Sequence, residues 1–189
     1  MSTALQTKTG NTLNGVDVER VLALAGSMQK DEEFGRFRFR ATTQWIDGAH
    51  SRSAIQDFFA GGEEVADRSK PHHLDADQPY FLAGENIAPN PVEYVLHALD
   101  SCLTVTLVCH AAVNGISLRA VETSSEGQMD ARGFFGVSDR VNKGYERIQV
   151  KMRVKSDADV ETLTRLAMHS PVYEMVSRSV PVEFKLIRT

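Results

Sequence analysis

Cys102 is the residue of this chain whose type and position are best suited to chemistry. It lies with Cys109 in a long apolar segment. A thiolate attacks peroxides and disulfides, and forming one near neutral pH requires a nearby cation or a helix N-terminus. No lysine or arginine occurs between Lys70 and Arg119, so an activating charge must come from another element or another subunit. The alternative is that Cys102 is a small buried hydrophobic residue, as many free cysteines are.

The two cysteines cannot bond to each other within one intact helix. Seven residues separate Cys102 from Cys109, which is about 10 Å along a helix axis. A disulfide requires Cα atoms within about 7 Å. Two cysteines are also too few for a disulfide framework or a cysteine-rich zinc site.

The histidines and glycines do not indicate a metal or cofactor site. His72 and His73 are adjacent, and His97 and Cys102 are five residues apart rather than the four of a helical ligand pair. Gly61-Gly62 is not followed by the Gly-Lys-Ser/Thr of a phosphate-binding loop. We therefore expect no metal and no cofactor. The remaining histidines are His50, His110 and His169.

The composition indicates one ordinary globular domain of 189 residues, with 42% hydrophobic residues. The net charge of −4 lacks the basic footprint of a nucleic-acid-binding protein. The sequence has no uninterrupted run of about eighteen apolar residues, so we expect no membrane span. The polar N-terminus lacks the apolar stretch of an export signal, which predicts a cytoplasmic protein.

The first 33 residues are predicted to be an extension, followed by a domain over residues 34–189. Residues 1–13 are polar and predict a flexible tail. Asn14 is a possible cap for a helix that runs to about Lys30.

A strand pair is predicted to follow this extension. Apolar residues alternate with arginines and other polar residues from Phe34 to Trp45, which is typical of a half-buried strand. Asp47-Gly48 predicts a hairpin turn, and the return strand, over residues 50–59, carries Arg52. Residues 61–79 predict a loop or an irregular hairpin, and residues 80–83 a short extended segment.

Residues 90–114 predict one long helix at the centre of the molecule. Asn90 is a suitable cap, Pro91 suits the first turn, and Gly115 suits the position after the last turn. The helix is apolar enough to be buried on most sides. Glu93 lies in its first turn, about 180° around the helix and about 13 Å along the axis from Cys102. The two residues therefore cannot touch within one straight helix.

The rest of the chain predicts strands over residues 117–125, 145–155 and 182–186. Residues 126–144 form a loop or weak hairpin, a helix spans residues 157–169, and a short helix follows Ser170-Pro171. This order of mixed elements indicates an α+β fold.

The segment APNPVEYVLHALDSCLTVTLVCHAAVNGISL resembles the OsmC/Ohr family of thiol-dependent hydroperoxide reductases. The matching features are the Asn90-Pro91 helix start, a cysteine about ten residues later, and the helix end at Asn114-Gly115. The late SPVYEMV segment also matches, and the resemblance covers roughly residues 34–189. It implies the OsmC-like fold, with antiparallel sheets packed around a long buried helix in an intertwined homodimer.

The resemblance also implies roles for individual residues. Cys102 matches the peroxidatic cysteine, and Arg52 is the best match to the family's activating arginine. The family's acidic residue would fall at Val92, so Glu93, one residue later, is the candidate that orients the arginine. Arg38 and Arg40 are weaker candidates for the arginine. All three arginines could instead belong to a solvated strand face.

The position of the family's second, resolving cysteine carries Ser170, which cannot form a disulfide and suits a helix cap. The resemblance therefore predicts reduction of organic hydroperoxides, in oxidative-stress defence, with an external thiol as reductant. In the implied homodimer, Arg52 or Glu93 could approach Cys102 from the partner chain. The alternatives are an inactive dimer that binds a small apolar or acyl ligand, and a purely structural homodimer.

Overall fold

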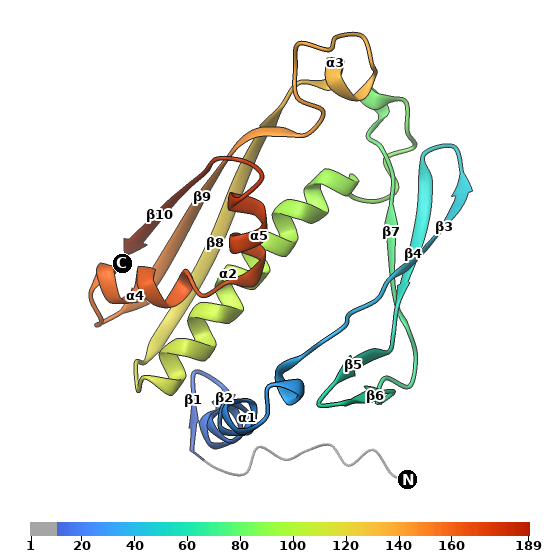
Figure 1. The fold of residues 1–189 in the computed structure, drawn as a ribbon. Helices are drawn as coiled ribbons and strands as arrows, with labels where there is room; N and C mark the ends of the chain where they lie inside the picture. The colour runs from blue at the N-terminus through green and yellow to red at the C-terminus, as the bar shows by residue number, and fades with distance from the viewer. Residues whose placement is uncertain (1–10) are drawn as a thin grey trace. The chain divides into compact units, whose positions relative to one another are not determined.

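A computed structural model of the chain describes residues 11–189 and divides it into two compact units. We call residues 11–19 and 96–189 the core unit and residues 20–95 the hairpin unit (Figure 1). The predicted extension of residues 1–33 stays a prediction. Residues 1–10 of its predicted tail lie outside the described residues.

The first described residues form a small hairpin rather than a capped helix start. Strands β1 (Thr12–Leu13) and β2 (Val16–Asp17) pair antiparallel, and helix α1 spans Val18–Lys30. Asn14 lies in the turn with a φ of 53°, a conformation that asparagine tolerates. Its side chain donates to the Ile116 carbonyl and accepts from the Leu118 N–H. The prediction that Asn14 caps the helix is therefore wrong.

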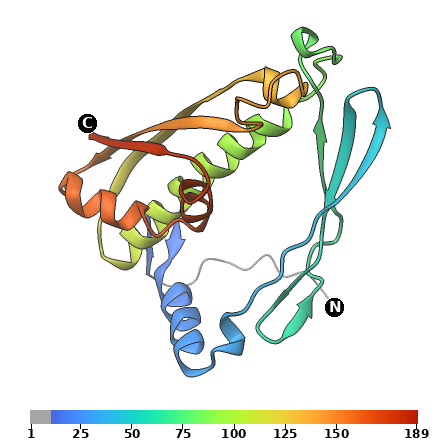
Figure 2. The ribbon, with the colours of Figure 1, turned by 45° about the horizontal axis from the view of Figure 1, so that its top comes forward.

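The hairpin unit contains a three-stranded antiparallel sheet in the order β3-β4-β7 (Figure 2). Its strands are β3 (Thr42–Asp47), β4 (His50–Ile55) and β7 (His72–Ala76). The predicted turn at Asp47-Gly48 is confirmed, with Gly48 at a φ of 51°. The first strand begins at Thr42 rather than at Phe34. The residues before Thr42 pair with another segment through one isolated bridge, between Arg38 and Phe59, and therefore form no continuous ladder.

The predicted return strand is split in two. After β4, strand β5 (Phe58–Ala60) pairs with β6 (Glu63–Val65) in a separate two-stranded hairpin. Short 3-10 turns occupy η1 (Glu33–Gly35) and η2 (Tyr80–Leu82). The segment at Tyr80 is therefore a turn and not the extended segment predicted, and it closes on Ala83 in the left-handed conformation, with a φ of 63°.

The central helix α2 spans Pro91–Val113, as its sequence signals predict. Gly115 follows it at a φ of 70°, and the N–H of Ile116 bonds back to the Ala111 carbonyl. This closure is the glycine-terminated helix end expected from the sequence.

The core unit contains a mixed sheet in the order β10-β9-β8. Strands β8 (Leu118–Met129) and β9 (Tyr145–Ser156) are antiparallel, whereas β10 (Val182–Arg188) runs parallel to β9. The loop after β8 carries α3 (Ala131–Phe134), and α4 (Val160–Ala167) and α5 (Pro171–Ser177) connect β9 to β10. A crossover through two helices allows this parallel pairing. The predicted α+β class, with antiparallel pairing elsewhere, is confirmed.

One face of this sheet packs against α2 and α4 (Figure 1). Every second residue of β9 from Ile148 to Val154 is buried, as strand geometry requires. Fully buried leucines of both helices complete this core: Leu99, Leu103, Leu107, Leu163 and Leu166.

Within the described core unit, the buried residues of helix α2 lie on the side that faces the sheet. Val95 and Val105 are 40% and 55% exposed, so the expectation of burial on most sides is not met by a single chain. By length and composition the helix could also cross a bilayer, and a third of its most apolar window is buried inside the protein. Core helices of soluble proteins meet the same description, so the length and composition of α2 do not by themselves indicate that it crosses a membrane.

Candidate functional site

Cys102 lies on α2 with a partly exposed side chain and no disulfide partner. Cys109 is also free and partly exposed on the same helix. Both cysteines belong to the core unit, whereas Arg52 and Glu93 belong to the hairpin unit. The described residues hold no group of three or more His, Cys, Asp or Glu side chains that could bind a metal ion.

Glu93 closes the N-terminus of α2 through a capping box. The Asn90 side chain accepts from the Val92 N–H at 3.0 Å, and the Glu93 carboxylate accepts from the Asn90 N–H at 2.8 Å. Reciprocal bonds of this kind satisfy two donors that the helix leaves unpaired. The sequence carried the signal for this role, because a cap residue followed three positions later by glutamate is the capping-box pattern.

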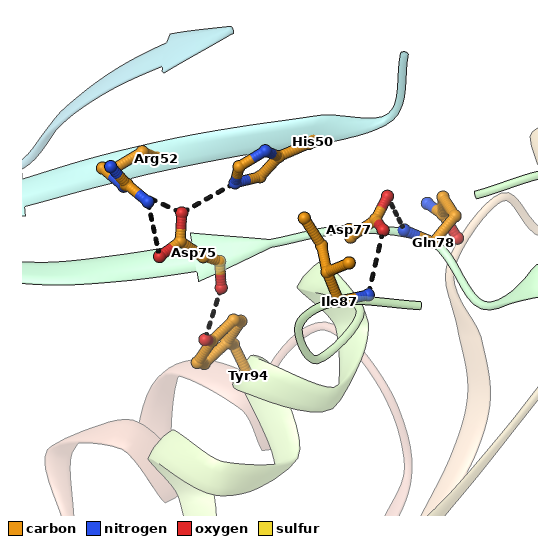
Figure 3. Close-up of polar contacts among 7 residues, drawn as sticks. All are labelled: His50, Arg52, Asp75, Asp77, Gln78, Ile87 and Tyr94. Atoms are coloured by element: carbon orange, nitrogen blue, oxygen red, sulfur yellow. Dashed lines mark hydrogen bonds and ion pairs between the residues drawn. The ribbon is translucent and has the colours of Figure 1, made fainter. Parts of the chain in front are cut away.

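Arg52 forms a two-pronged ion pair with Asp75 (Figure 3). Its Nε donates to Asp75 Oδ1 at 2.9 Å and its Nη2 to Oδ2 at 3.2 Å. The two residues are directly opposite each other on strands β4 and β7. Among the ion pairs of residues 11–189, Arg52 therefore contacts Asp75 and not Glu93.

Two further side chains hold Asp75 (Figure 3). His50, two residues before Arg52 on the same strand face, places Nε2 at 2.7 Å from Oδ1. The Tyr94 hydroxyl, in the first turn of α2, donates to the Asp75 backbone carbonyl at 2.6 Å. The hydrogen bonds from Arg52 and then from His50 hold the pKa of Asp75 below its ordinary value, so the carboxylate is ionised at neutral pH.

A buried carboxylate organises the segment between β7 and α2. Asp77 is 1% exposed and accepts backbone N–H bonds from Gln78, Glu85 and Ile87. Figure 3 shows the bonds from Gln78 and Ile87. Burial acts to raise the pKa of Asp77, but these three bonds outweigh it and lower the pKa below its ordinary value. The segment exposes Tyr80 and Phe81.

The two alternative arginines have partners of their own in the hairpin unit. Arg40 makes a two-pronged pair with Glu64, with donor–acceptor distances of 2.8 and 2.7 Å. Arg38 lies 3.8 Å from the same carboxylate and stacks on the ring of Phe59 at 4.3 Å. Arg38 and Arg40 thus pair with Glu64, whereas Arg52 pairs with Asp75.

A shallow groove of about 640 Å³ lies between α2 and β8 in the core unit. Asp100 lines it and accepts from Ser125 at 2.8 Å through one oxygen. Its other oxygen is buried and has no hydrogen-bond partner among residues 11–189. Burial raises the pKa of Asp100, and the Ser125 bond partly opposes this. Hydroxyls of Thr104 and Thr123 bond to each other across the groove at 2.7 Å.

Ser170, at the position of a resolving cysteine in the resembled family, is a helix cap. Its hydroxyl accepts from the Tyr173 N–H at 3.2 Å, and the residue is 1% exposed. Beside it, the rings of His169 and His110 stack with centroids 4.5 Å apart. The predicted cap at the Ser170-Pro171 helix start is confirmed.

Sequence reasoning missed Asp75, His50 and Asp77. The spacing of two between His50 and Arg52 indicated that they share a strand face, but nothing in the sequence identified the strand opposite. Asp75 and Asp77 lie in the polar stretch that was predicted to be a loop or irregular hairpin.

A family model described as OsmC-like protein matches residues 84–185. A search of curated proteins gave no match. Among solved structures, an OsmC-like protein from Mycoplasma pneumoniae is 11% identical with a TM-score of 0.61. That match covers 80% of this chain and 97% of the other. A Legionella pneumophila structure is described as an organic hydroperoxide resistance protein OsmC, predicted redox protein and regulator of sulfide bond formation. It is 21% identical with a TM-score of 0.52, covering 79% of this chain and 96% of the other.

A third structure, an organic hydroperoxide resistance protein from Elizabethkingia anophelis, is 14% identical with a TM-score of 0.55. The match covers 80% of this chain and 95% of the other. At these identities the solved structures establish the fold and not the activity.

Proposed function

We propose that this chain, which belongs to the OsmC-like protein family, is a thiol-dependent reductase of organic hydroperoxides with Cys102 as the reacting group. The observation that carries the proposal is the state of this cysteine. It lies within the family-matched segment, partly exposed and free of any disulfide, as a thiol that must meet a substrate requires.

The proposed reaction is a two-electron transfer from sulfur to the peroxide. The Cys102 thiolate attacks the terminal oxygen of ROOH, the O–O bond breaks, and the alkoxide leaves and takes up a proton to give ROH. Cys102 becomes a sulfenic acid. One external thiol then condenses with the sulfenic acid to form a mixed disulfide with Cys102, and water is released. A second external thiol attacks this mixed disulfide, which returns Cys102 to the thiol and joins the two external thiols in a disulfide. An external reductant is needed because Ser170 cannot resolve the sulfenic acid and Cys109 lies too far along the helix.

Arg52 is the proposed source of the positive charge that stabilises the thiolate. α2 carries no lysine or arginine, and Arg52 is held at one edge by Asp75 with its side chain 51% exposed. Glu93 is the residue to which the family resemblance assigns the orienting role, and in this structure it caps α2. Its capping bond to Asn90 engages one carboxylate oxygen, Oε2.

We propose that the active form is a homodimer. Among the described residues, the hairpin unit exposes large apolar side chains, among them Trp45 (73%) and Phe39 (71%). Val95 and Val105 of α2 are exposed as well. A second copy would remove this apolar surface from water. The expected measurement is a mass of two chains by light scattering after gel filtration, and a mass of one chain at micromolar concentration would contradict it.

The second candidate function is a dimer that binds a small apolar or acyl ligand. The groove lined by Val105, Val108 and the Thr104–Thr123 hydroxyl pair favours it. For either function we propose a cytoplasmic protein, because the cytosol keeps thiols reduced and both cysteines are free. We propose no nucleic acid and no membrane as partner.

The test of the proposed function is an intact-mass assay. Reduced protein is mixed with one equivalent of cumene hydroperoxide and a sulfenic-acid trap, beside Cys102→Ser and Cys109→Ser variants. We expect a rapid single adduct in the wild type and in Cys109→Ser, and none in Cys102→Ser. If the wild type forms no adduct while both variants remain folded, the reductase proposal fails and the ligand-binding dimer becomes the working hypothesis.

A further inference from the structure

Among the arginine–carboxylate pairs of residues 11–189, the Arg52–Asp75 pair is the one whose carboxylate also contacts a histidine; Asp130, which pairs with Arg132, is more buried, at 24% exposed, but forms no such contact. The Asp75 carboxylate also bonds to His50, and its side chain is 35% exposed. Glu64 pairs only with Arg38 and Arg40 and is 55% exposed, and Asp157 pairs with Arg119 and is 88% exposed. Surface pairs of the latter kind contribute little to stability. A carboxylate with donors of two types is more strongly fixed.

The geometry of β4 and β7 fixes one edge of the Arg52 guanidinium. Arg52 and Asp75 are Cα partners in the antiparallel ladder, and opposite residues on one face lie close enough to interact directly. Nε and one N–H of Nη2 are engaged by the carboxylate. A guanidinium has five N–H donors, so three of them are not used in the pair with Asp75.

Asp75 is in turn hydrogen-bonded to the first turn of α2. The Tyr94 hydroxyl donates to the Asp75 carbonyl, and Tyr94 directly follows Glu93 in the helix. His50 is partly buried, with its side chain 17% exposed, and contacts Oδ1 from the strand that carries Arg52. Asp75 is thereby held at its backbone carbonyl by Tyr94 and at carboxylate Oδ1 by His50, independently of its bonds to Arg52.

We infer that Asp75 is the positioning residue for Arg52, held in place by His50, and that it does the orienting assigned on family resemblance to Glu93. This inference rests on the proposed thiol chemistry of Cys102. Val92, at the family's acidic position, has no charge, and the Glu93 carboxylate caps α2. A carboxylate from a neighbouring strand supplies what these two positions do not.

Removing the Asp75 charge can act in two opposite directions, and the direction identifies its role. If Asp75 only neutralises Arg52, Asp75→Asn removes a negative charge beside the guanidinium. The positive potential that Arg52 exerts on Cys102 then rises, so Cys102 ionises at lower pH and reacts faster. If Asp75 positions Arg52, the same change frees the guanidinium to swing away. The midpoint of Cys102 ionisation then moves to higher pH, and the reaction slows.

The experiment measures two rates for Cys102 in the full-length protein with Cys109 replaced by serine. One is the second-order rate with cumene hydroperoxide, and the other is the pH dependence of alkylation by iodoacetamide. We expect Arg52→Ala to slow the hydroperoxide reaction by about a hundredfold and Asp75→Asn by about tenfold, with the alkylation midpoint moved to higher pH in both. Asp75→Glu should recover part of the loss.

His50 and the control pair complete the design. His50→Gln retains an N–H donor at the position of Nε2 and should react within about threefold of the wild type, whereas His50→Ala should follow Asp75→Asn. Asp157→Asn, which breaks the exposed pair with Arg119, should change neither rate. Thermal unfolding of each variant identifies any loss that comes from unfolding alone.

The outcomes separate the two proposals. A wild type that does not react with cumene hydroperoxide defeats the proposed function, and the alkylation midpoints still report on Arg52 and Asp75. If Arg52→Ala is slow but Asp75→Asn matches the wild type or reacts faster, the positioning role of Asp75 is wrong while the role of Arg52 stands. If Arg52→Ala leaves the alkylation midpoint unchanged, both roles are wrong.

Discussion

The core unit and the hairpin unit are stabilised in different ways. The core unit buries a continuous set of apolar side chains between α2, α4 and one face of its sheet. Within residues 20–95, no apolar side chain is buried, and the only buried residues are Asp77 and Asn90. Hydrophobic burial is the dominant favourable contribution to folding. The comparison indicates that apolar burial holds the core unit together, whereas the described hairpin unit relies mainly on its strand pairing and polar bonds.

The apolar side chains of the hairpin unit sharpen this difference. Its exposed apolar residues are aromatic and β-branched or leucine side chains that normally form cores: Leu22, Leu24, Phe37, Phe39, Trp45, Ile46, Leu74, Tyr80, Phe81, Ile87 and Val95. Within the described residues these side chains remain exposed to water, which is costly. The proposed homodimer follows from this imbalance rather than from any single contact.

The largest expected effect is on the core. Leu103→Ala removes a side chain that is fully buried on α2 and should lower the free energy of unfolding by about 2–5 kcal/mol. Val105→Ala, two residues along the same helix and 55% exposed, should lower the stability of a single chain by well under half of that amount. Urea unfolding at low protein concentration measures both. Equal losses would contradict the assignment of the core to one side of α2.

The next effect concerns self-association through the hairpin unit. Trp45→Ser should leave the single chain folded, because this side chain is largely exposed, but should weaken dimer formation by about tenfold to thirtyfold, as the loss of a buried interface tryptophan does. Sedimentation at several concentrations measures the dissociation constant. Met175→Gln, at an exposed apolar position on α5, is the control. An unchanged constant for Trp45→Ser would place the interface elsewhere.

A smaller and more local effect is expected at Asp77. Asp77→Ala leaves three backbone N–H groups without their acceptor and should speed amide hydrogen exchange over residues 78–87 by at least tenfold, with β9 unchanged. Because the folded pKa of Asp77 is lowered, its contribution is present above the ordinary carboxyl range and is lost as the pH falls through the folded pKa. Exchange that rises equally in β9 would mean that the hairpin unit does not open independently.

The smallest effect is a pH dependence specific to the core unit. Burial, and then the neighbouring His169, lower the pKa of His110. At pH values between the folded and the ordinary pKa, His110 is protonated in the unfolded chain but not in the folded chain. The free energy of unfolding therefore falls as the pH drops through about 6.5 toward the folded pKa. Urea midpoints at pH 7.5 and 5.5 should differ less in His110→Gln than in the wild type. His72→Gln, an exposed histidine of the hairpin unit, should keep the wild-type difference.

The sequence by itself determined the features that depend on neighbouring residues. Asn90, Pro91 and Gly115 defined the limits of α2, Asp47-Gly48 defined the first hairpin turn, and Ser170-Pro171 defined the start of α5. In each case a cap, a fixed φ or a left-handed glycine acts within a few residues of its own position. The strand predicted over residues 145–155 is found as β9, and the alternation of its apolar and polar residues matches its buried face for the same local reason.

Only the tertiary structure decided which side chains meet. Arg52 contacts Asp75, twenty-three residues away in a segment whose sequence looked like a loop, and β10 pairs with β9 in parallel after two intervening helices. Strand register decides both, and shifting a strand by one residue would turn every side chain to the other face. Register is set by the sum of contacts along the ladder, so no short stretch of sequence contains it.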